Sequence, residues 1–231
     1  MTVLYESEDF CIIDNALLYK GDCLEIMKNI PDGSVDLILT DPPYGMSFQS
    51  NYREQKHKKI LNDDSLHWLS AFINELYRVM KNNTAGYMFC SFHKIDIFKI
   101  EIEKRFKLKN ILIWEKNNTS MGDLKGDFAP KIEFVFFFHK GRSLIRGKRD
   151  PNIFKFKRTQ NEKHPTEKPV DLCEYLVTKF SDENQIVLDP FMGSGTTGVA
   201  CKKCKRRFFG IEADRDHFNT SKERIASEVS I

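Results

Sequence analysis

The chain has 231 residues, of which 41% are hydrophobic and 30% charged, enough for one soluble domain with a substantial core. Its net charge of +3 is too small to indicate a nucleic-acid partner by itself, so the distribution of charge matters more. No stretch approaches the ~18 consecutive apolar residues of a membrane span, and residues 1–15 lack a signal-peptide pattern, so we expect one cytoplasmic domain over residues 1–231 without a membrane partner.

Short apolar runs alternate along the chain with amphipathic segments. The expected strands are, in chain order, 16–19, 35–39, 85–91, 111–115, 132–139, 185–188 and 207–211. The expected helices are 22–29, 64–80, 94–104, 169–180, 196–203 and 214–228. This alternation predicts a mostly parallel sheet with helices on both faces.

The tetrapeptide Asp41-Pro42-Pro43-Tyr44 directly follows the apolar run 35–39. Ligands of open α/β sheets bind beyond the carboxyl ends of the strands. The amino group of adenine is a weak nucleophile because its lone pair is delocalised into the ring. Asp41 and the Pro42 carbonyl could accept its two hydrogens and localise that lone pair, while Tyr44 offers a flat face to a base turned out of a duplex. An ordinary turn is the alternative interpretation, since Asp-Pro is common in turns.

Two polar segments interrupt the alternation. Residues 46–62 carry basic side chains, including Arg53, Lys56 and Lys58, and we expect a mobile loop on the catalytic side. Residues 141–163 hold two acidic residues and eight basic ones, which are Arg142, Arg146, Lys148, Arg149, Lys155, Lys157, Arg158 and Lys163. Phe154 and Phe156 stand between these cations, which favours contact with a nucleic-acid backbone plus stacking or wedging, although a solvated loop has a similar composition.

Residues 187–197 combine a strand, a glycine-rich turn and the start of a helix. Glycine lets the backbone approach a ligand closely, and the helix presents free N–H groups to an anion such as a carboxylate. Glu212 ends the next expected strand, where an acid can bind a ribose diol. The candidate ligand-binding residues here are Asp189, Pro190, Phe191, Gly193, Ser194, Gly195, Thr196, Thr197 and Glu212.

These motifs, in this order, resemble the β class of amino-methylating DNA methyltransferases, in which the catalytic motif precedes the motif for S-adenosylmethionine (AdoMet). The resemblance extends over residues 17–223. The segment His164-Pro165-Thr166-Glu167-Lys168-Pro169 is similar to a family segment that helps to hold the cofactor, which implies cofactor roles for His164, Thr166 and Lys168. The segment 19–22 is similar to one whose aspartate, here Asp22 with Cys23 beside it, contacts the adenine of the cofactor.

The resemblance implies a Rossmann-like methyltransferase fold with a circularly permuted motif order. We expect a seven-stranded, mostly parallel sheet with helices on both faces, and 132–138 in or beside the one reversed strand. The implied activity is transfer of a methyl group from AdoMet to adenine N6 at a short site in double-stranded DNA, by base flipping and without a covalent enzyme intermediate. A homodimer and a cognate restriction endonuclease are the further partners that the family allows.

Adenine is favoured over cytosine because the family's adenine enzymes usually carry Asp at the first position of the tetrapeptide and its cytosine-N4 enzymes Ser. A cytosine-N4 or RNA methyltransferase would use the same pockets and remains an alternative. A catalytically dead nucleic-acid-binding module would not need both motifs, and a nicotinamide-dependent oxidoreductase is opposed by the missing G-x-G-x-x-G pattern. The histidines and cysteines lack metal-ligand spacing, so no metal site is expected.

Overall fold

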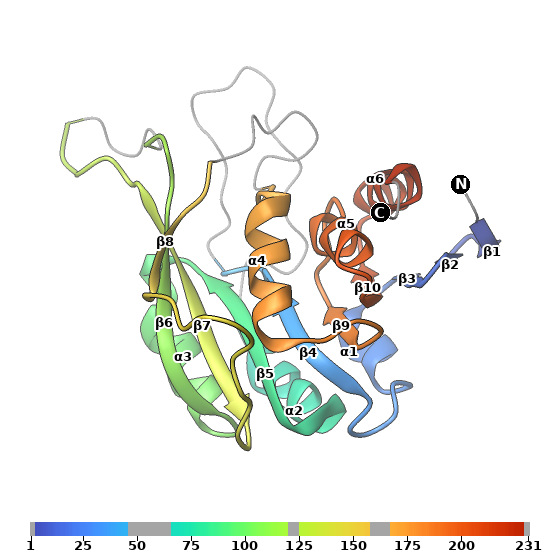
Figure 1. Cartoon of the computed structure of the whole chain (residues 1–231), viewed down its shortest axis with the longest axis horizontal. Helices are drawn as coiled ribbons and strands as arrows, with labels where there is room; N and C mark the ends of the chain where they lie inside the picture. The colour runs from blue at the N-terminus through green and yellow to red at the C-terminus, as the bar shows by residue number, and fades with distance from the viewer. Residues whose placement is uncertain (1–2, 46–65, 120–124, 158–166, 229–231) are drawn as a thin grey trace.

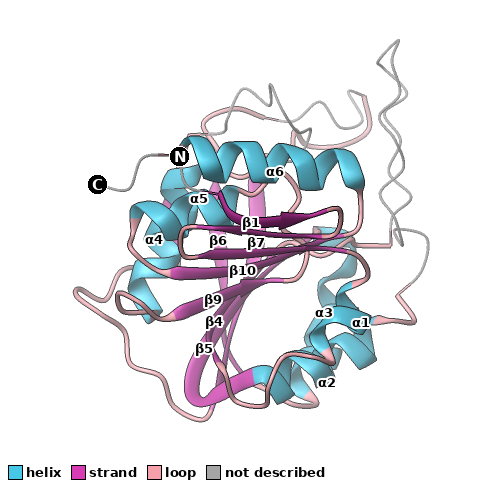
Figure 2. Cartoon of the chain, turned by 90° about the vertical axis from the view of Figure 1, so that its right-hand side faces the viewer, coloured by secondary structure: helices cyan, strands magenta, loops and turns pink. Residues whose placement is uncertain are grey.

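The computed structural model describes residues 3–45, 66–119, 125–157 and 167–228. Within these ranges the chain forms one sheet of ten strands in the order β1-β2-β3-β10-β9-β4-β5-β7-β6-β8. Helices cover both faces of this sheet, as Figures 1 and 2 show. The α/β class and the two covered faces agree with the sequence prediction.

The elements follow the predicted alternation closely. The strands are β1 (Val3–Ser7), β2 (Phe10–Ile13), β3 (Ala16–Lys20), β4 (Val35–Thr40), β5 (Met80–Cys90), β6 (Lys107–Glu115), β7 (Ile132–Lys140), β8 (Ile153–Lys155), β9 (Ile186–Asp189) and β10 (Arg207–Glu212). The helices are α1 (Cys23–Met27), α2 (Leu69–Val79), the 3-10 helix η1 (Phe92–Lys94), α3 (Ile95–Glu103), α4 (Val170–Phe180), α5 (Thr196–Lys203) and α6 (Arg215–Ser227).

The sheet has a parallel centre and a mixed edge. Strands β3, β10, β9, β4 and β5 are parallel neighbours. Strand β7 lies antiparallel between β5 and β6, so the expectation of a reversed strand at 132–138 is confirmed. The expectation of seven strands is wrong for the described residues, because the hairpin β1–β2 extends one edge and the three-residue β8 pairs with β6 at the other.

Two apolar layers hold the sheet between its helices. Helices α4, α5 and α6 pack on one face, and α1, α2 and α3 pack on the other. All six residues of β4 are buried, because this central strand is covered on both faces. Helix α2 ends at Val79 and β5 starts at once with Met80, five residues before the start expected at Ala85. No helix of the described ranges is long and apolar enough to span a membrane.

Candidate functional site

The predicted site residues lie where four parallel strands have their carboxyl ends. This end of the sheet is called below the Asp41 edge, and the opposite end of the same strands is called the far edge. Strands β9 and β4 pair through Leu188 and Ile38, so Asp189 at the end of β9 and Asp41 just after β4 lie at the same end of adjacent strands. Strand β10 lies on the other side of β9 and ends at Glu212. The backbone N–H of Gly21, which follows β3, donates to the Glu212 carbonyl at 2.9 Å, and this places Asp22 next in the row. Both sequence motifs therefore meet at the upper end of the sheet in Figure 1.

Asp41 is held by two donors. The Tyr44 hydroxyl donates to Asp41 Oδ1, and the Lys168 ammonium donates to Oδ2 at 2.6 Å. The Asp41 side chain keeps 26% of its surface exposed, so it remains partly accessible to solvent. Burial, followed by the charge of Asp41, raises the pKa of Tyr44 well above its usual value, and the tyrosine stays a hydrogen-bond donor. Pro42 and Pro43 are buried, and their rings restrict the backbone between Asp41 and Tyr44.

Lys168 belongs to a chain of alternating charges that the sequence pattern did not reveal. Its ammonium also lies 3.1 Å from Glu133 Oε2, and Glu133 Oε1 lies 2.8 Å from Lys116 Nζ. Burial alone would lower the pKa of Lys168, but the carboxylates of Asp41 and Glu133 outweigh it and raise the pKa above its usual value. Lys168 is therefore a permanent cation next to Asp41. Nothing in the local sequence around Glu133 or Lys116 signals this role, because the partners come from four separate segments.

The glycine-rich turn is built around the buried side chain of Asp189. Its Oδ1 accepts the backbone N–H of Phe191 at 3.2 Å, and its Oδ2 accepts the Thr197 hydroxyl at 2.7 Å. Burial raises the pKa of Asp189 to about 7 despite these hydrogen bonds. The side chain thus ties the end of β9 to the first turn of α5. Pro190 is buried, and the Phe191 ring packs against the Phe72 ring, with 5.1 Å between the two ring centroids.

Two glycines give the turn its shape, at Gly193 with φ +51° and Gly195 with φ +81°. A Cβ on Gly193 would meet no described atom within 4 Å, whereas one on Gly195 would lie 2.8 Å from the Cβ of Ser221 in α6. No side chain of the described residues caps the N-terminus of α5 at Gly195. The turn therefore presents an open backbone surface at Gly193 and the positive end of a helix beside it.

Arg224 of α6 supports this turn and is a further residue that the sequence analysis missed. Its Nη1 donates to the Ser194 carbonyl at 2.8 Å and to the Ser194 hydroxyl at 2.7 Å, with Thr196 Oγ1 at 3.3 Å. Its Nη2 donates to Glu167 at 2.6 Å. The side chains of Ser194 and Thr196 thus face α6. Arg224 lies in a helix that carries charges at many positions, so no sequence signal separates it from surface residues.

Glu212 and Asp22 complete the row on the other side of the turn. Glu212 Oε2 accepts the backbone N–H of Gly193 at 2.9 Å, and Oε1 accepts that of Asp214 at 2.8 Å. Each carboxylate oxygen can accept a further hydrogen bond. The Asp22 side chain caps α1 by accepting the N–H of Leu24 at 2.8 Å, and Cys23 beside it is buried.

The structure places the predicted DNA-binding residues that it describes partly at the Asp41 edge and partly at the far edge, which is the opposite end of the strands. Because β7 is antiparallel, the chain leaves it at the lower end in Figure 1, away from Asp41. The residues after β7 lie next to the C-terminal end of α4. There Arg146 donates to both carboxylate oxygens of Asp182, and Lys179 donates to the carbonyl of Lys148. Within the described residues 141–157, the basic side chains therefore do not form one continuous surface, and whether they bind DNA stays a prediction. The residues at the far edge are Arg142, Arg146, Lys148 and Arg149.

Strand β8 then returns the chain to the Asp41 edge and brings Lys155 and Lys157 with it. It runs parallel to β6, and Lys155 pairs in register with Glu115. Phe154 and Phe156 are half-buried, and each ring centroid lies 5.6 Å from that of Tyr175 in α4. The Trp114 indole also donates to the Phe156 carbonyl at 3.0 Å. Both phenylalanines thus pack beneath the strand, which opposes a role for either as a wedge in DNA.

Some of the predicted site residues lie outside the described ranges. These are the loop 46–62 with Arg53, Lys56 and Lys58, and the residues Arg158, His164 and Thr166. Among the described residues, no group of three or more His, Cys, Asp or Glu side chains could hold a metal ion.

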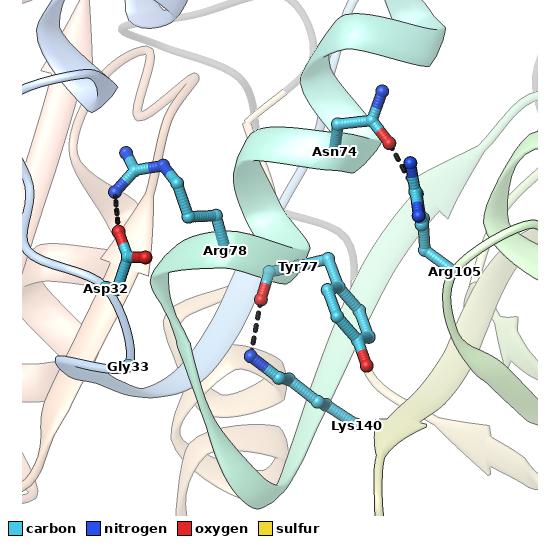
Figure 3. A pocket seen from close by; sticks show the side chains of 7 residues that line it. All are labelled: Asp32, Gly33, Asn74, Tyr77, Arg78, Arg105 and Lys140. Carbon is cyan, nitrogen blue, oxygen red and sulfur yellow. Dashed lines mark hydrogen bonds and ion pairs between the residues drawn. The ribbon is translucent and has the colours of Figure 1, made fainter.

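A cavity of about 480 Å³ lies at the edge opposite Asp41 (Figure 3). Its cations serve the fold: Arg78 binds Asp32 and the carbonyl of Ile30, and Lys140 donates to the carbonyls of Tyr77 and Met80. Residues from the segments that precede β4 and β5 line this cavity. It therefore lies at the opposite end of these strands from both sequence motifs.

Known proteins match this chain over most of its length. YubD of Escherichia coli (strain K12), a methylase by its name, is 34% identical over 209 residues, which are 90% of this chain and 89% of the relative. The DNA adenine methyltransferase YhdJ of the same organism is 28% identical and covers 90% of this chain and 82% of its own length.

Among solved structures, the complex of M1.HpyAVI with SAM superimposes with a TM-score of 0.72 at 28% identity, covering 91% of this chain and 99% of that one. The family model described as DNA methylase matches residues 35–155 and 146–223, which include Asp41, Asp189 and Glu212. The chain therefore belongs to the DNA methylase family, and the edge that carries these residues is its candidate active site.

Proposed function

We propose that this protein transfers a methyl group from AdoMet to the N6 amino group of adenine within a short sequence of double-stranded DNA. The observation that carries the proposal is the position of Asp41 beside the glycine-rich turn at one edge of the sheet. A cofactor on the turn and a base at Asp41 would be immediate neighbours. Holding the two reactants in this way supplies much of the rate enhancement of a direct transfer.

The residues of the turn fit AdoMet. The open space at Gly193, the N-terminus of α5 and the carboxylate of Glu212 suit a ligand with a carboxylate at one end and a ribose diol further along. We assign the turn Asp189–Thr197 to the methionine part, Glu212 to the ribose and Asp22 to the adenine. When bound, AdoMet supplies an electrophilic methyl group on a sulfonium ion.

Asp41 and the Pro42 carbonyl prepare the nucleophile. The Asp41 carboxylate accepts one N6 hydrogen and the Pro42 carbonyl accepts the other, which localises the nitrogen lone pair for attack on the methyl carbon. The C–S bond breaks as the N–C bond forms, and the methylated nitrogen then loses one of its hydrogens to solvent. Tyr44 keeps its hydroxyl on Asp41 and offers its ring to the extruded base.

The first prediction is the chemical identity of the product. Asp41 provides a charged acceptor for the amino group, and aspartate at this position favours adenine among the family's enzymes. Unmethylated plasmid DNA incubated with labelled AdoMet should yield 6-methyladenine after digestion to nucleosides and chromatography. A predominant 4-methylcytosine peak would overturn the base assignment and leave methyl transfer standing. Label in RNA but not in DNA would overturn the substrate.

The second prediction concerns the cofactor. Glu212→Gln keeps the size of the side chain but removes the charge that strengthens a hydrogen bond to a diol, and its amide nitrogen can no longer accept one of the two backbone N–H groups. A charge-assisted bond contributes about 1.5–3 kcal/mol, so the AdoMet Kd should rise about ten- to a hundredfold. Calorimetric titration measures it, with Glu174→Gln as the control, because Glu174 in α4 pairs with Lys203 at the end of α5 and takes no part in the row of site residues. An unchanged Kd for Glu212→Gln would remove it from the ribose site.

DNA should approach over the ends of β6, β7 and β8. Lys155 is 77% exposed and Lys131 47%, and both lie beside Glu115 at the edge that carries Asp41. Lys157 follows at the end of β8 and is exposed. Phe128, in the β6–β7 connection, is 93% exposed and adds an aromatic surface to this rim. Cations at such a rim bind phosphates without reading the sequence.

The third prediction compares the two edges of the sheet. Replacing Lys131, Lys155 and Lys157 by glutamine should weaken DNA binding and flatten its salt dependence, by roughly 0.9 in the slope of log K against log salt for each phosphate that is no longer neutralised. The matched control replaces Arg142, Lys148 and Arg149 at the far edge, removes the same charge and should leave the slope unchanged. Fluorescence anisotropy at several salt concentrations measures both. Equal slopes for the two triple variants would show that neither edge is specifically the DNA face.

A further inference from the structure

The chain of charges at Asp41 has a consequence for the chemistry of the site. Four charged side chains alternate in sign in the order Asp41, Lys168, Glu133 and Lys116, with separations of 2.6, 3.1 and 2.8 Å. The two lysines are only 10% and 8% exposed, so both ammonium groups are removed from most of the solvent. Burying such groups is unfavourable unless they are paired, and the alternation pairs each of them.

Lys168 faces the catalytic carboxylate. Its ammonium has three hydrogens, and two of them are directed to Asp41 and Glu133. The ammonium also lies 4.8 Å from the centre of the Phe89 ring, which belongs to β5 between β4 and β7. The resemblance to known methyltransferases assigns this lysine to the cofactor, but its contacts lie on the Asp41 side of the edge.

The far half of the chain of charges braces Lys168. Glu133 is the second residue of β7, and Lys116 directly follows β6, where its backbone N–H donates to the Lys131 carbonyl at 2.9 Å. Glu133 and Lys116 are therefore fixed by the hairpin ladder. The charges of Lys168 and Lys116 overcome the effect of burial and lower the pKa of Glu133, which keeps it ionised between them.

The neighbour of Lys168 connects the same segment to the cofactor half. Glu167 binds Arg224 at 2.6 Å, and Arg224 holds the backbone and hydroxyl of Ser194 in the glycine-rich turn. Two adjacent residues thus reach both motifs, one through Arg224 and the other directly. This short segment just before α4 therefore contacts Asp41 directly and the turn through Arg224.

We infer that Lys168, braced by Glu133 and Lys116, is a positioning residue for Asp41 and fixes its carboxylate in the orientation that accepts an amino hydrogen of the target base. The inference rests on the proposed function of Asp41. Among the described residues, Oδ1 and Oδ2 each hold one donor, Tyr44 and Lys168, which leaves each oxygen a lone pair for the base. Without the ammonium, the side chain could rotate away from the entering amino group.

The test uses Lys168→Met, Lys168→Arg and the control Lys179→Met. Lys179 lies near the other end of α4 and pairs with Asp150, so its loss removes a comparable lysine far from the site. The expected result for Lys168→Met is a single-turnover rate that falls about a hundredfold at saturating AdoMet and DNA, with the AdoMet Kd changed by less than about threefold. Lys168→Arg should recover part of the rate because it restores the cation, and Lys179→Met should keep the wild-type rate.

A second variant tests the brace without unbalancing the charge. Glu133→Gln with Lys116→Met removes one anion and one cation together, so Asp41 and Lys168 stay paired. This variant keeps the inference testable if Lys168→Met does not fold. Its rate should fall about tenfold with an unchanged AdoMet Kd. An AdoMet Kd that rises more than about tenfold in Lys168→Met, with a normal rate at saturation, would show a cofactor ligand and overturn the inference.

Failure of the proposed function would look different. Wild-type protein would then transfer no methyl group to adenine, and the rates would not bear on Lys168. Crystal structures of the wild type and of Lys168→Met, or of the Glu133→Gln, Lys116→Met variant if the first does not fold, decide the inference in that case. An Asp41 side chain that rotates in the variant supports the positioning role, and one that keeps its orientation and its contact with Tyr44 overturns it.

Discussion

Replacing Asp41 by alanine should lower the rate of methyl transfer on the order of 10³-fold, while AdoMet binding stays close to that of the wild type. The expected loss resembles that for a charged or polar group that acts on the reacting centre in the transition state. The Asp41 carboxylate accepts hydrogen bonds from Tyr44 and Lys168, and neither of these residues belongs to the glycine-rich turn. The chemistry should fail although the cofactor still binds.

The fold should tolerate this change, because Lys168 retains Glu133 as a partner at 3.1 Å. Asp41→Asn is the informative companion, since it keeps an acceptor oxygen but loses the charge. The control is Asp182→Ala, which removes a carboxylate from the far edge, where it binds Arg146. Turnover is compared with AdoMet affinity for each variant. Turnover of Asp41→Ala near the wild-type value would remove the residue from the catalytic site.

Local sequence patterns predicted most elements, because hydrophobic periodicity reports burial directly. Strand β4 is an example: six consecutive buried residues appear in the sequence as a mainly apolar run that contains one aspartate and ends in a threonine. That aspartate, Asp36, is paired with Lys81 at 2.6 Å, so it does not break the strand. The two motifs at the strand ends followed from the general position of ligands in α/β sheets. The expected gap between 64–80 and 85–91 is wrong, because β5 follows α2 directly and no turn separates them.

The charge relationships of the site could not be read in this way. Lys168 and Asp41 are 127 positions apart, and their contact depends on the packing of α4 against the sheet. The position of Arg142 and Lys148 shows the opposite case. The expected reversal of 132–138 already implied that the chain leaves this strand at the far edge, so strand direction could have separated these residues from Lys155. Composition grouped them because it carries no information about direction.

The turn between β9 and α5 contains two glycines with different tasks, and alanine substitutions should separate them. Gly195 has φ +81°, and its Cβ would lie 2.8 Å from the Cβ and 3.0 Å from the Cα of Ser221. Strain and overpacking together should lower the stability of Gly195→Ala by about 2–4 kcal/mol. The melting temperature of a domain of this size should then fall by roughly 4–16 °C.

Gly193 has φ +51° and open space around its would-be Cβ among the described residues, so Gly193→Ala should lose only about 1–2 kcal/mol. The same space is where we place the methionine part of AdoMet, and a methyl group there should raise the Kd about tenfold. Melting curves with and without AdoMet measure both effects. The cofactor should shift the melting temperature of Gly195→Ala, provided it folds, more than that of Gly193→Ala. A full cofactor shift in Gly193→Ala would mean that AdoMet does not approach the backbone at this glycine.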